Sequence, residues 1–365
     1  MSAPRVAFHA PLKPPDAERP SGDRRIARLT LAALERAGFA PFLASRLRTL
    51  DLKGDAGAQA ALRDAAEAEV SRLVAALAAD PPALWYTYHC YWKAPDLVGP
   101  RVARALGIPY AISEPSVSPR RREGPWAGFA AAAEDAIAAA DLLLWSTERD
   151  RPALAGFLGG EERMARLAPF LDLGPRPGAR AAGTGPLRLI AVGMMRPGDK
   201  AESYARLAAA LARVRADWRL EVVGDGAERG AVETLFAPFG DRVQFRGVLE
   251  GEALRAALEG AELLVWPGVG EGIGMLYLEA QAAGLACLAE DRPGPRDVVH
   301  PWRALPAPGD AAGFAAAIEA AAGDRAALAE AGRAARAAAE RTHSLDAAAA
   351  LLRDRLGALI GATAG

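Results

Sequence analysis

Short apolar runs alternate along the chain with longer amphipathic or alanine-rich stretches. An apolar run of about four to eight residues is typical of a strand buried in a parallel sheet, whereas the longer stretches favour helices. In the first half the runs predict strands at residues 5–10, 41–45, 84–88, 110–113 and 142–146. The stretches between them predict helices at residues 21–37, 56–79, 98–106 and 126–140.

The pattern is interrupted at residues 170–186, where proline, glycine and small residues are typical of an interdomain linker. It then restarts, with strands expected at residues 187–192, 220–223, 243–245, 262–266 and 286–289. Helices are expected at residues 202–214, before Phe236, at 250–258 and 275–283, and in three alanine-rich segments at 311–322, 324–341 and 345–360.

The length of 365 residues exceeds what one hydrophobic core usually supports. We expect an N-terminal domain at residues 1–175, a linker at 176–186, a C-terminal domain at 187–345 and a last helix at 346–365 that packs back on the first domain. Alternating strands and helices predict a parallel sheet covered by helices in each half. The predicted fold class is α/β, with two Rossmann-like, doubly wound domains that face each other across a cleft.

Ligands of such sheets bind at the carboxyl ends of the strands. In the first half these ends are Ala10, His89, Glu114 and Thr147. The loop after the first strand ends at Ser21 and Gly22, where a helix is expected and Ser21 is a suitable N-cap. This arrangement suits a polar or anionic ligand, and an ordinary flexible loop is the alternative.

Hydrophobic residues at 51% and charged residues at 24% are typical of an ordinary globular protein. The formal net charge of −1 argues against a nucleic-acid partner. Residues 1–48, however, hold nine Lys or Arg against four Asp or Glu, an excess that favours phosphates or an anionic membrane surface, unless it is simply a solvated face. Since no signal peptide or long apolar span is visible, we expect a cytoplasmic protein, with the inner face of the membrane as one location.

The richest stretch for function is residues 265–289, which joins a strand to a helix through a glycine loop. Pro267 and Gly268 end the strand, and the helix is expected to begin at Met275. Two carboxylates, Glu271 and Glu279, flank the corner between loop and helix. A glycine loop before a helix N-terminus is a ready site for an anionic group. A packed strand-helix unit with solvent-facing acids is the alternative.

Two basic residues follow the first strand of the second half. Arg196 and Lys200 are placed in its loop, where both could converge on a diphosphate. The nearby segment 224–230, G-D-G-A-E-R-G, does not qualify as a dinucleotide fingerprint, because it follows the second strand of its domain and lacks the later acid.

No metal or other cofactor is expected, because the four histidines are scattered without paired ligand spacing. Nucleophile elbows, zinc-helix motifs and Walker loops do not occur in the sequence. The two cysteines, Cys90 and Cys287, lie in or beside apolar runs and are typical of small buried hydrophobic residues.

Four segments in order carry a family resemblance: I-A-V-G-M-M-R-P-G-D-K, L-E-V-V-G-D-G, V-Q-F-R-G-V-L and E-G-I-G-M-L-Y-L-E-A-Q-A-A-G. Residues 187–360 resemble the nucleotide-sugar-binding domain of family 4 retaining glycosyltransferases (glycosyl transferases group 1), which have the GT-B fold. The last segment carries the pair of glutamates, separated by seven residues, of that family. The resemblance implies metal-independent transfer of a sugar from a nucleotide diphosphate sugar, as substrate, to an acceptor with retention of configuration.

The resemblance also implies roles for single residues. Glu279 would bind the donor ribose, Glu271 would lie near the transferred sugar, and Arg196 and Lys200 would neutralise the diphosphate. Further donor-site positions are Gly193, Gly247, Val248, Gly272, Ile273, Gly274 and Met275, with Gly247 and Val248 beside the base and the helix from Met275 at the phosphates.

The first half matches the family only in architecture and would bind the acceptor, an unidentified glycan, lipid or small molecule. Many members carry a histidine at the end of a strand near the reacting sugar. Here that strand ends in Glu114, and His89 ends a neighbouring strand. With Ser21 and Gly22 these residues are the acceptor-side candidates. A nucleotide-sugar epimerase of the same fold and a catalytically degenerate nucleotide-binding partner protein stay open as alternatives.

Overall fold

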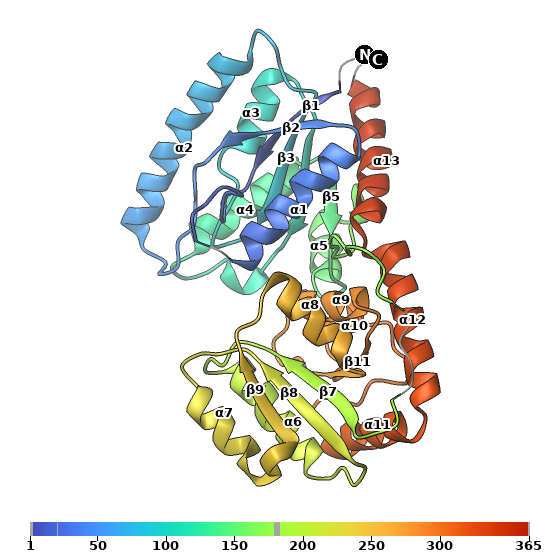
Figure 1. The fold of residues 1–365 in the computed structure, drawn as a ribbon. Helices are drawn as coiled ribbons and strands as arrows, with labels where there is room; N and C mark the ends of the chain where they lie inside the picture. Colours follow the sequence, from blue (N-terminus) through green and yellow to red (C-terminus); the bar gives the residue numbers. More distant parts are fainter. Residues whose placement is uncertain (1–2, 20, 179–182, 364–365) are drawn as a thin grey trace. The chain divides into compact units, whose positions relative to one another are not determined.

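The computed structural model describes residues 3–19, 21–178 and 183–363. The chain divides into two compact units, one of residues up to Ala168 together with those from Leu345 onward, and one of Pro169–Ser344. Each unit holds a parallel sheet with helices packed on it (Figure 1), so the predicted α/β fold class with two Rossmann-like domains is confirmed. The expected linker, 176–186, falls in the second unit, and its residues 179–182 lie outside the described residues.

The first unit is built on a sheet in the order β2-β1-β3-β4-β5-β6. Its strands are β1 (Arg5–His9), β2 (Ala40–Ser45), β3 (Leu84–Cys90), β4 (Tyr110–Pro115), β5 (Leu142–Trp145) and β6 (Met164–Arg166). Its helices are α1 (Gly22–Arg36), α2 (Ala56–Leu77), α3 (Gly99–Leu106), the short 3₁₀ turn η1 (Pro119–Arg121), α4 (Ala127–Ala139), α5 (Arg151–Leu158) and α13 (Leu345–Thr363).

The last helix, α13, packs along the first helix, α1, so the two ends of the described chain meet in one unit (Figure 1). Arg353 of α13 donates hydrogen bonds of 3.0 Å to the carbonyl oxygens of Arg36 and Ala37. These carbonyls end α1 and have no partner within the helix, so the arginine caps it.

The second unit has a parallel sheet in the order β11-β10-β7-β8-β9. Its strands are β7 (Leu187–Val192), β8 (Trp218–Val223), β9 (Val243–Gly247), β10 (Leu263–Val265) and β11 (Ala286–Leu288). Its helices are α6 (Asp199–Leu211), α7 (Arg229–Phe236), the 3₁₀ turn η2 (Ala237–Arg242), α8 (Gly251–Gly260), α9 (Met275–Ala282), α10 (Pro295–Val298), α11 (Ala311–Gly323) and α12 (Arg325–Thr342). The strand order reverses at β7, so the loops after β7 and β10 leave the sheet side by side, where such folds bind ligands.

One helix begins earlier than the sequence pattern indicates. Helix α6 starts at Asp199 instead of residue 202, because Gly198 adopts a positive φ of 82° that ends the preceding loop. The prediction that Lys200 lies in a loop is therefore wrong, and Lys200 belongs to the first turn of α6.

A buried ion pair fixes the carboxyl end of β1. The two ring nitrogens of His9 lie 3.2 Å from Asp96 Oδ1 and 3.1 Å from the carbonyl oxygen of Leu47, so both are placed to donate. Burial alone would lower the pKa of His9, but the Asp96 carboxylate and the Leu47 carbonyl raise it above its ordinary value. Burial likewise opposes the ionised form of Asp96, and His9 and the backbone amide of Gly99 hold the pKa of this carboxyl far below its ordinary value.

We expect Asp96→Asn to lower the free energy of unfolding by about 3–5 kcal/mol, because it leaves a buried imidazolium without its counter-charge. The raised pKa of His9 means that its contribution to stability is complete below about pH 6.5 and is lost as the pH rises through its pKa in the folded protein. Urea unfolding at several pH values checks both points, with the exposed Asp135→Asn as control. Equal stability and equal pH dependence of the wild type and Asp96→Asn would contradict the account.

Candidate functional site

The loops after β7 and β10 touch through Gly193 and Trp266. A Cβ atom on Gly193 would lie 2.8 Å from a ring carbon of Trp266, so only glycine allows this contact. The Gly193 amide donates to the carbonyl oxygen of Val223 (2.9 Å), and the amide of Gly224 donates to that of Gly247 (2.8 Å). Backbone hydrogen bonds thus join the carboxyl ends of β7, β8 and β9 to one another.

The polar centre of this site is Lys200, Glu271 and Trp266. The Lys200 ammonium group donates to Glu271 Oε1, and Trp266 Nε1 donates to the same oxygen at 3.1 Å. The ammonium group also lies 5.5 Å from the centroid of the Trp266 ring, within reach of a cation–π contact. With 15% and 17% of their side chains exposed, Lys200 and Glu271 are a largely buried pair on an aromatic floor.

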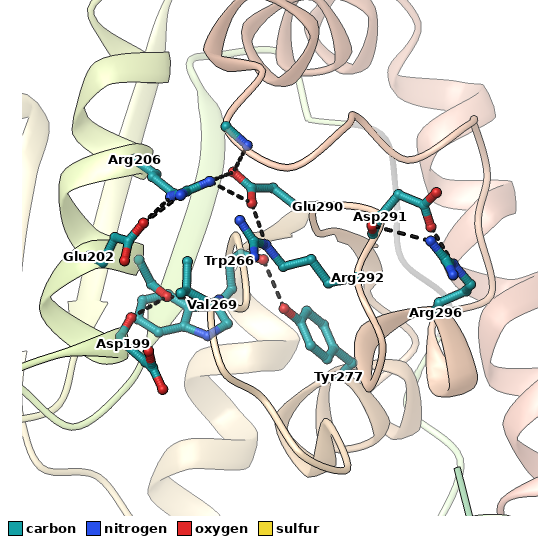
Figure 2. A network of polar contacts seen from close by, with 12 residues as sticks. Asp199, Glu202, Arg206, Trp266, Val269, Tyr277, Glu290, Asp291, Arg292 and Arg296 are labelled. Carbon is teal, nitrogen blue, oxygen red and sulfur yellow. Dashed lines mark hydrogen bonds and ion pairs between the residues drawn. The ribbon is translucent and has the colours of Figure 1, made fainter. Parts of the chain in front are cut away.

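Trp266 is held by two tyrosines, Tyr204 and Tyr277. Its ring makes an edge contact with Tyr204, with centroids 4.9 Å apart, and the Tyr204 hydroxyl donates to the Gly193 carbonyl at 2.7 Å. The Tyr277 hydroxyl donates to the Trp266 carbonyl at 2.9 Å, as Figure 2 shows. All three aromatic side chains are buried. The Trp266 ring that contacts the ion pair is therefore buried and well packed.

Helix α6 is tied directly to the glycine loop. Ser203 Oγ accepts a hydrogen bond of 3.0 Å from the Val269 amide and donates one of 2.9 Å to the Asp199 carbonyl. Loop and helix N-terminus therefore keep a fixed separation, which sets where Lys200 and Glu271 meet.

The loop after β11 is fastened to the same elements by Glu290, which is buried. Its carboxylate accepts hydrogen bonds from Arg206 of α6 (3.1 Å), Arg292 (2.6 Å) and the Gly309 amide (2.9 Å), a network drawn in Figure 2. Its own amide donates to the Pro267 carbonyl at 3.1 Å. These contacts were not expected from the sequence, although Glu290, an acid directly after a predicted strand, was a detectable signal.

The remaining predicted donor residues surround this centre. Gly272 and Ile273 lie in the loop after β10, Gly274 is the N-cap of α9 with a φ of 75°, and Met275 is the first residue of that helix. Glu279 follows one turn later and is half-buried.

Three other candidates stand apart from the ion pair. Arg196 is exposed in the loop after β7, and no described contact joins it to Lys200. Gly247 ends β9 at the edge of the sheet, two strands from β7, and Val248 after it is 64% exposed. Their assignment to the diphosphate and the base stays a prediction.

In the first unit the structure brings His89 and Glu114 together at the carboxyl ends of β3 and β4. His89 Nδ1 lies 3.9 Å from Glu114 Oε2 and 3.6 Å from Asp23 Oδ1 of α1. Both His89 and Glu114 adopt positive φ, 63° and 51°, which side chains other than glycine rarely adopt and which is common at functional sites. Ser21 serves as the N-cap of α1, accepting a hydrogen bond of 3.2 Å from the Arg24 amide, and Gly22 begins that helix.

The carboxyl of Glu114 is perturbed. Burial, offset in part by the nearby His89 and reinforced by the carboxylates of Asp23 and Asp150, raises its pKa to about 7. The contact with His89 holds the pKa of Asp23 below its ordinary value. Glu114 is thus a carboxyl that changes its charge near neutral pH, a property found often at functional sites.

Among the described residues, no group of three or more His, Cys, Asp or Glu side chains is arranged to hold a metal ion. In the same part of the chain no helix combines the length and apolar character needed to cross a bilayer.

Solved structures define the class of fold. A lipopolysaccharide outer core galactosyltransferase, WaaB, superposes with a TM-score of 0.69 and 16% identity over 96% of this chain and 99% of that chain. A sucrose-phosphate synthase of Thermosynechococcus elongatus gives a TM-score of 0.70 and 19% identity over 99% and 100%. Anabaena HepE in complex with UDP gives 0.70 and 14% over 97% and 100%. The likeness confirms the predicted GT-B fold.

Matches by sequence cover less of the chain than the structural superpositions do. Residues 186–324 match the family model described as glycosyl transferases group 1, which confirms the resemblance to that group for this part of the chain. A GDP-mannose-dependent alpha-mannosyltransferase of Mycolicibacterium smegmatis is 38% identical over 31% of this chain and 28% of that protein. A 2-deoxystreptamine glucosyltransferase of Streptomyces kanamyceticus is 29% identical over 61% and 64%. The chain matches less than two thirds of the length of each.

Proposed function

We propose that this protein is a glycosyltransferase that moves a sugar from a nucleotide diphosphate sugar to an acceptor and retains the anomeric configuration. The observation that carries the proposal is the Lys200–Glu271 pair on Trp266, at the strand-order reversal of the second unit and inside the matched segment. The relatives named as a mannosyltransferase and a glucosyltransferase support sugar transfer. The complexes of HepE with UDP and UDP-glucose support a nucleotide sugar as donor.

In this proposal the bound donor separates Lys200 from Glu271, and each of the two side chains then contacts a different part of the donor. Lys200 turns from Glu271 to the diphosphate, and Glu271 accepts hydrogen bonds from hydroxyls of the transferred sugar. Breaking the sugar–phosphate bond develops negative charge on the leaving diphosphate, which a preorganised cation and a helix N-terminus stabilise. Both α6 and α9 begin beside the pair, and Arg196 and Glu279 would hold the phosphate and ribose from the rim.

Retention is proposed to follow from attack on the face that the leaving group occupies, with the departing phosphate accepting the proton of the acceptor. The acceptor is assigned to the first unit, near His89 and Glu114, and its identity is open among glycans, lipids and small molecules. Contact of the basic residues in 1–48 with an anionic membrane stays a prediction.

The test is a transfer assay with UDP-, GDP- and ADP-sugars and mixed acceptors, read by NMR of the anomeric proton. A glycoside with the anomeric configuration of the donor is the expected product. Inversion would disprove retention, and consumption of donor without acceptor would favour the epimerase. Binding of nucleotide without turnover of any donor would favour a degenerate binding protein.

Trp266→Phe is expected to lower kcat/KM for the donor about ten- to a hundredfold, because Glu271 loses a charge-assisted hydrogen bond while the apolar floor is kept. Trp218→Phe is the matched control, since Trp218 is equally buried and its ring nitrogen has no hydrogen-bond partner among the described residues. Steady-state kinetics on both variants distinguish a role of the Trp266–Glu271 hydrogen bond from a role in packing alone. If the two lose activity equally, Trp266 matters only for packing.

A further inference from the structure

Three carboxylates gather at the carboxyl ends of the sheet in the first unit. Glu114 is the last residue but one of β4, Asp23 lies in the first turn of α1, and Asp150 is the N-cap residue of α5. The charges of Asp23 and Asp150 both reach Glu114, whose pKa they raise. Neighbouring carboxylates destabilise one another's charged form unless a cation or a proton lies among them.

The basic groups among the described residues are shared unevenly by these carboxylates. His89, 3.6 Å away, and Lys13 hold the pKa of Asp23 below its ordinary value, and Arg149 lies 3.9 Å from Asp150. Asp150 also accepts hydrogen bonds from Ser116 (3.2 Å) and Thr147 (2.9 Å). Glu114 has no Lys or Arg partner among the described residues, and its nearest basic group is the His89 imidazole at 3.9 Å.

Polar atoms without partners surround Glu114. The hydroxyl of Tyr88, which is 1% exposed, lies beside Glu114 but makes no well-formed hydrogen bond with any described residue. His89 Nδ1 lies 3.6 Å from Asp23 Oδ1 and 3.9 Å from Glu114 Oε2, beyond hydrogen-bond distance of both. Buried polar atoms are nearly always hydrogen-bonded, so a cluster of unpaired ones indicates a place completed by a ligand.

An aromatic face borders the same place. The centroids of the Tyr91 and His89 rings lie 4.7 Å apart. Burial and the charge of Asp23 raise the pKa of the Tyr91 hydroxyl. The neighbouring Trp92 is already covered by Arg121 (4.2 Å) and Lys93 (4.8 Å), so a cation beside Asp23 would instead meet the half-buried Tyr91, whose ring also contacts Trp92 (6.1 Å).

We propose that this cluster binds the ammonium group of an amine-bearing acceptor, with Glu114 as its ion-pair partner and Asp23 and Tyr91 beside it. The proposal rests on the proposed function and narrows it, since it assigns the first unit a positively charged acceptor class. A neutral hydroxyl compound would leave Glu114 with only the His89 imidazole, which it shares with Asp23, as a basic neighbour, and an anionic compound would be repelled.

The experiment is isothermal titration of the full chain at pH 7.5, above the pKa of about 7 of Glu114. The probes are glucosamine, galactosamine and 2-deoxystreptamine, each against its N-acetylated form. We expect at least one amine to bind about tenfold or more tightly than its acetylated form. Glu114→Gln and Asp23→Asn should abolish this preference, whereas Glu67→Gln, on the exposed face of α2, should keep it.

Three results would overturn the proposal: no amine binds, amines and acetylated forms bind alike, or Glu114→Gln keeps the preference. Titration with nucleoside diphosphates in the same samples separates this outcome from failure of the proposed function. Diphosphate binding without amine preference rejects only the acceptor class, whereas loss of both rejects the glycosyltransferase assignment as well.

Discussion

Glu271→Gln is expected to bind a nucleoside diphosphate more tightly than the wild type while transferring sugar more slowly. In the structure the ammonium group of Lys200 is paired with the Glu271 carboxylate. A diphosphate must therefore displace this carboxylate before it can bind Lys200. The substitution releases Lys200 and removes a negative charge from the phosphate site, and the affinity should rise about three- to tenfold. The sugar loses its carboxylate partner, and kcat should fall roughly ten- to a hundredfold.

Calorimetry with the diphosphate and kinetics with the complete donor measure the two effects separately. Glu252→Gln is a suitable control, because Glu252 is an exposed carboxylate of α8 in the same unit. Weaker diphosphate binding together with unchanged transfer would show that Glu271 neither blocks Lys200 nor contacts the sugar.

Lys200→Gln should have the largest effect on catalysis. It removes the cation that faces the leaving diphosphate, and the loss of one preorganised charge-stabilising group typically costs about 10²–10³ in kcat. It also leaves the largely buried Glu271 with only the Trp266 hydrogen bond, so we expect the free energy of unfolding to fall by about 1–3 kcal/mol.

The double variant Lys200→Gln/Glu271→Gln separates these roles. Because the unpaired carboxylate is gone, most of the lost stability should return, while transfer stays low. Urea unfolding of both single variants and the double variant checks the coupling. Additive losses of stability would mean that the two side chains do not interact in solution.

The fold was largely predictable because apolar runs mark buried parallel strands whatever their partners. The strands of both sheets were expected, apart from β6, whose sequence M-A-R is too short and mixed to stand out. The start of α6 was missed, since the positive φ of Gly198, which sets it, is a property of the folded loop. The order of the strands, and therefore the meeting of the loops after β7 and β10, came only from the structure.

The site was predictable as a set of residue types and less so as a geometry. Glu271 and Lys200 were singled out because acids and bases near glycine loops are visible in a sequence, yet their pairing was not expected. Nothing in the sequence distinguishes Trp266 from other apolar strand residues, and only the structure shows that its ring nitrogen donates to Glu271. The gathering of Asp23 and Asp150 around Glu114 joins residues more than a hundred positions apart, which no local pattern reveals.

The central claim is that a nucleotide diphosphate binds at Lys200, and thermal unfolding with added nucleotides tests it most directly. At 100 times its dissociation constant, the matching UDP, GDP or ADP should stabilise the wild type by about 2.7 kcal/mol, and the parent nucleoside at the same concentration far less. Lys200→Gln should lose most of that stabilisation. Failure of all three diphosphates to stabilise the wild type, or equal stabilisation of Lys200→Gln, would contradict the account.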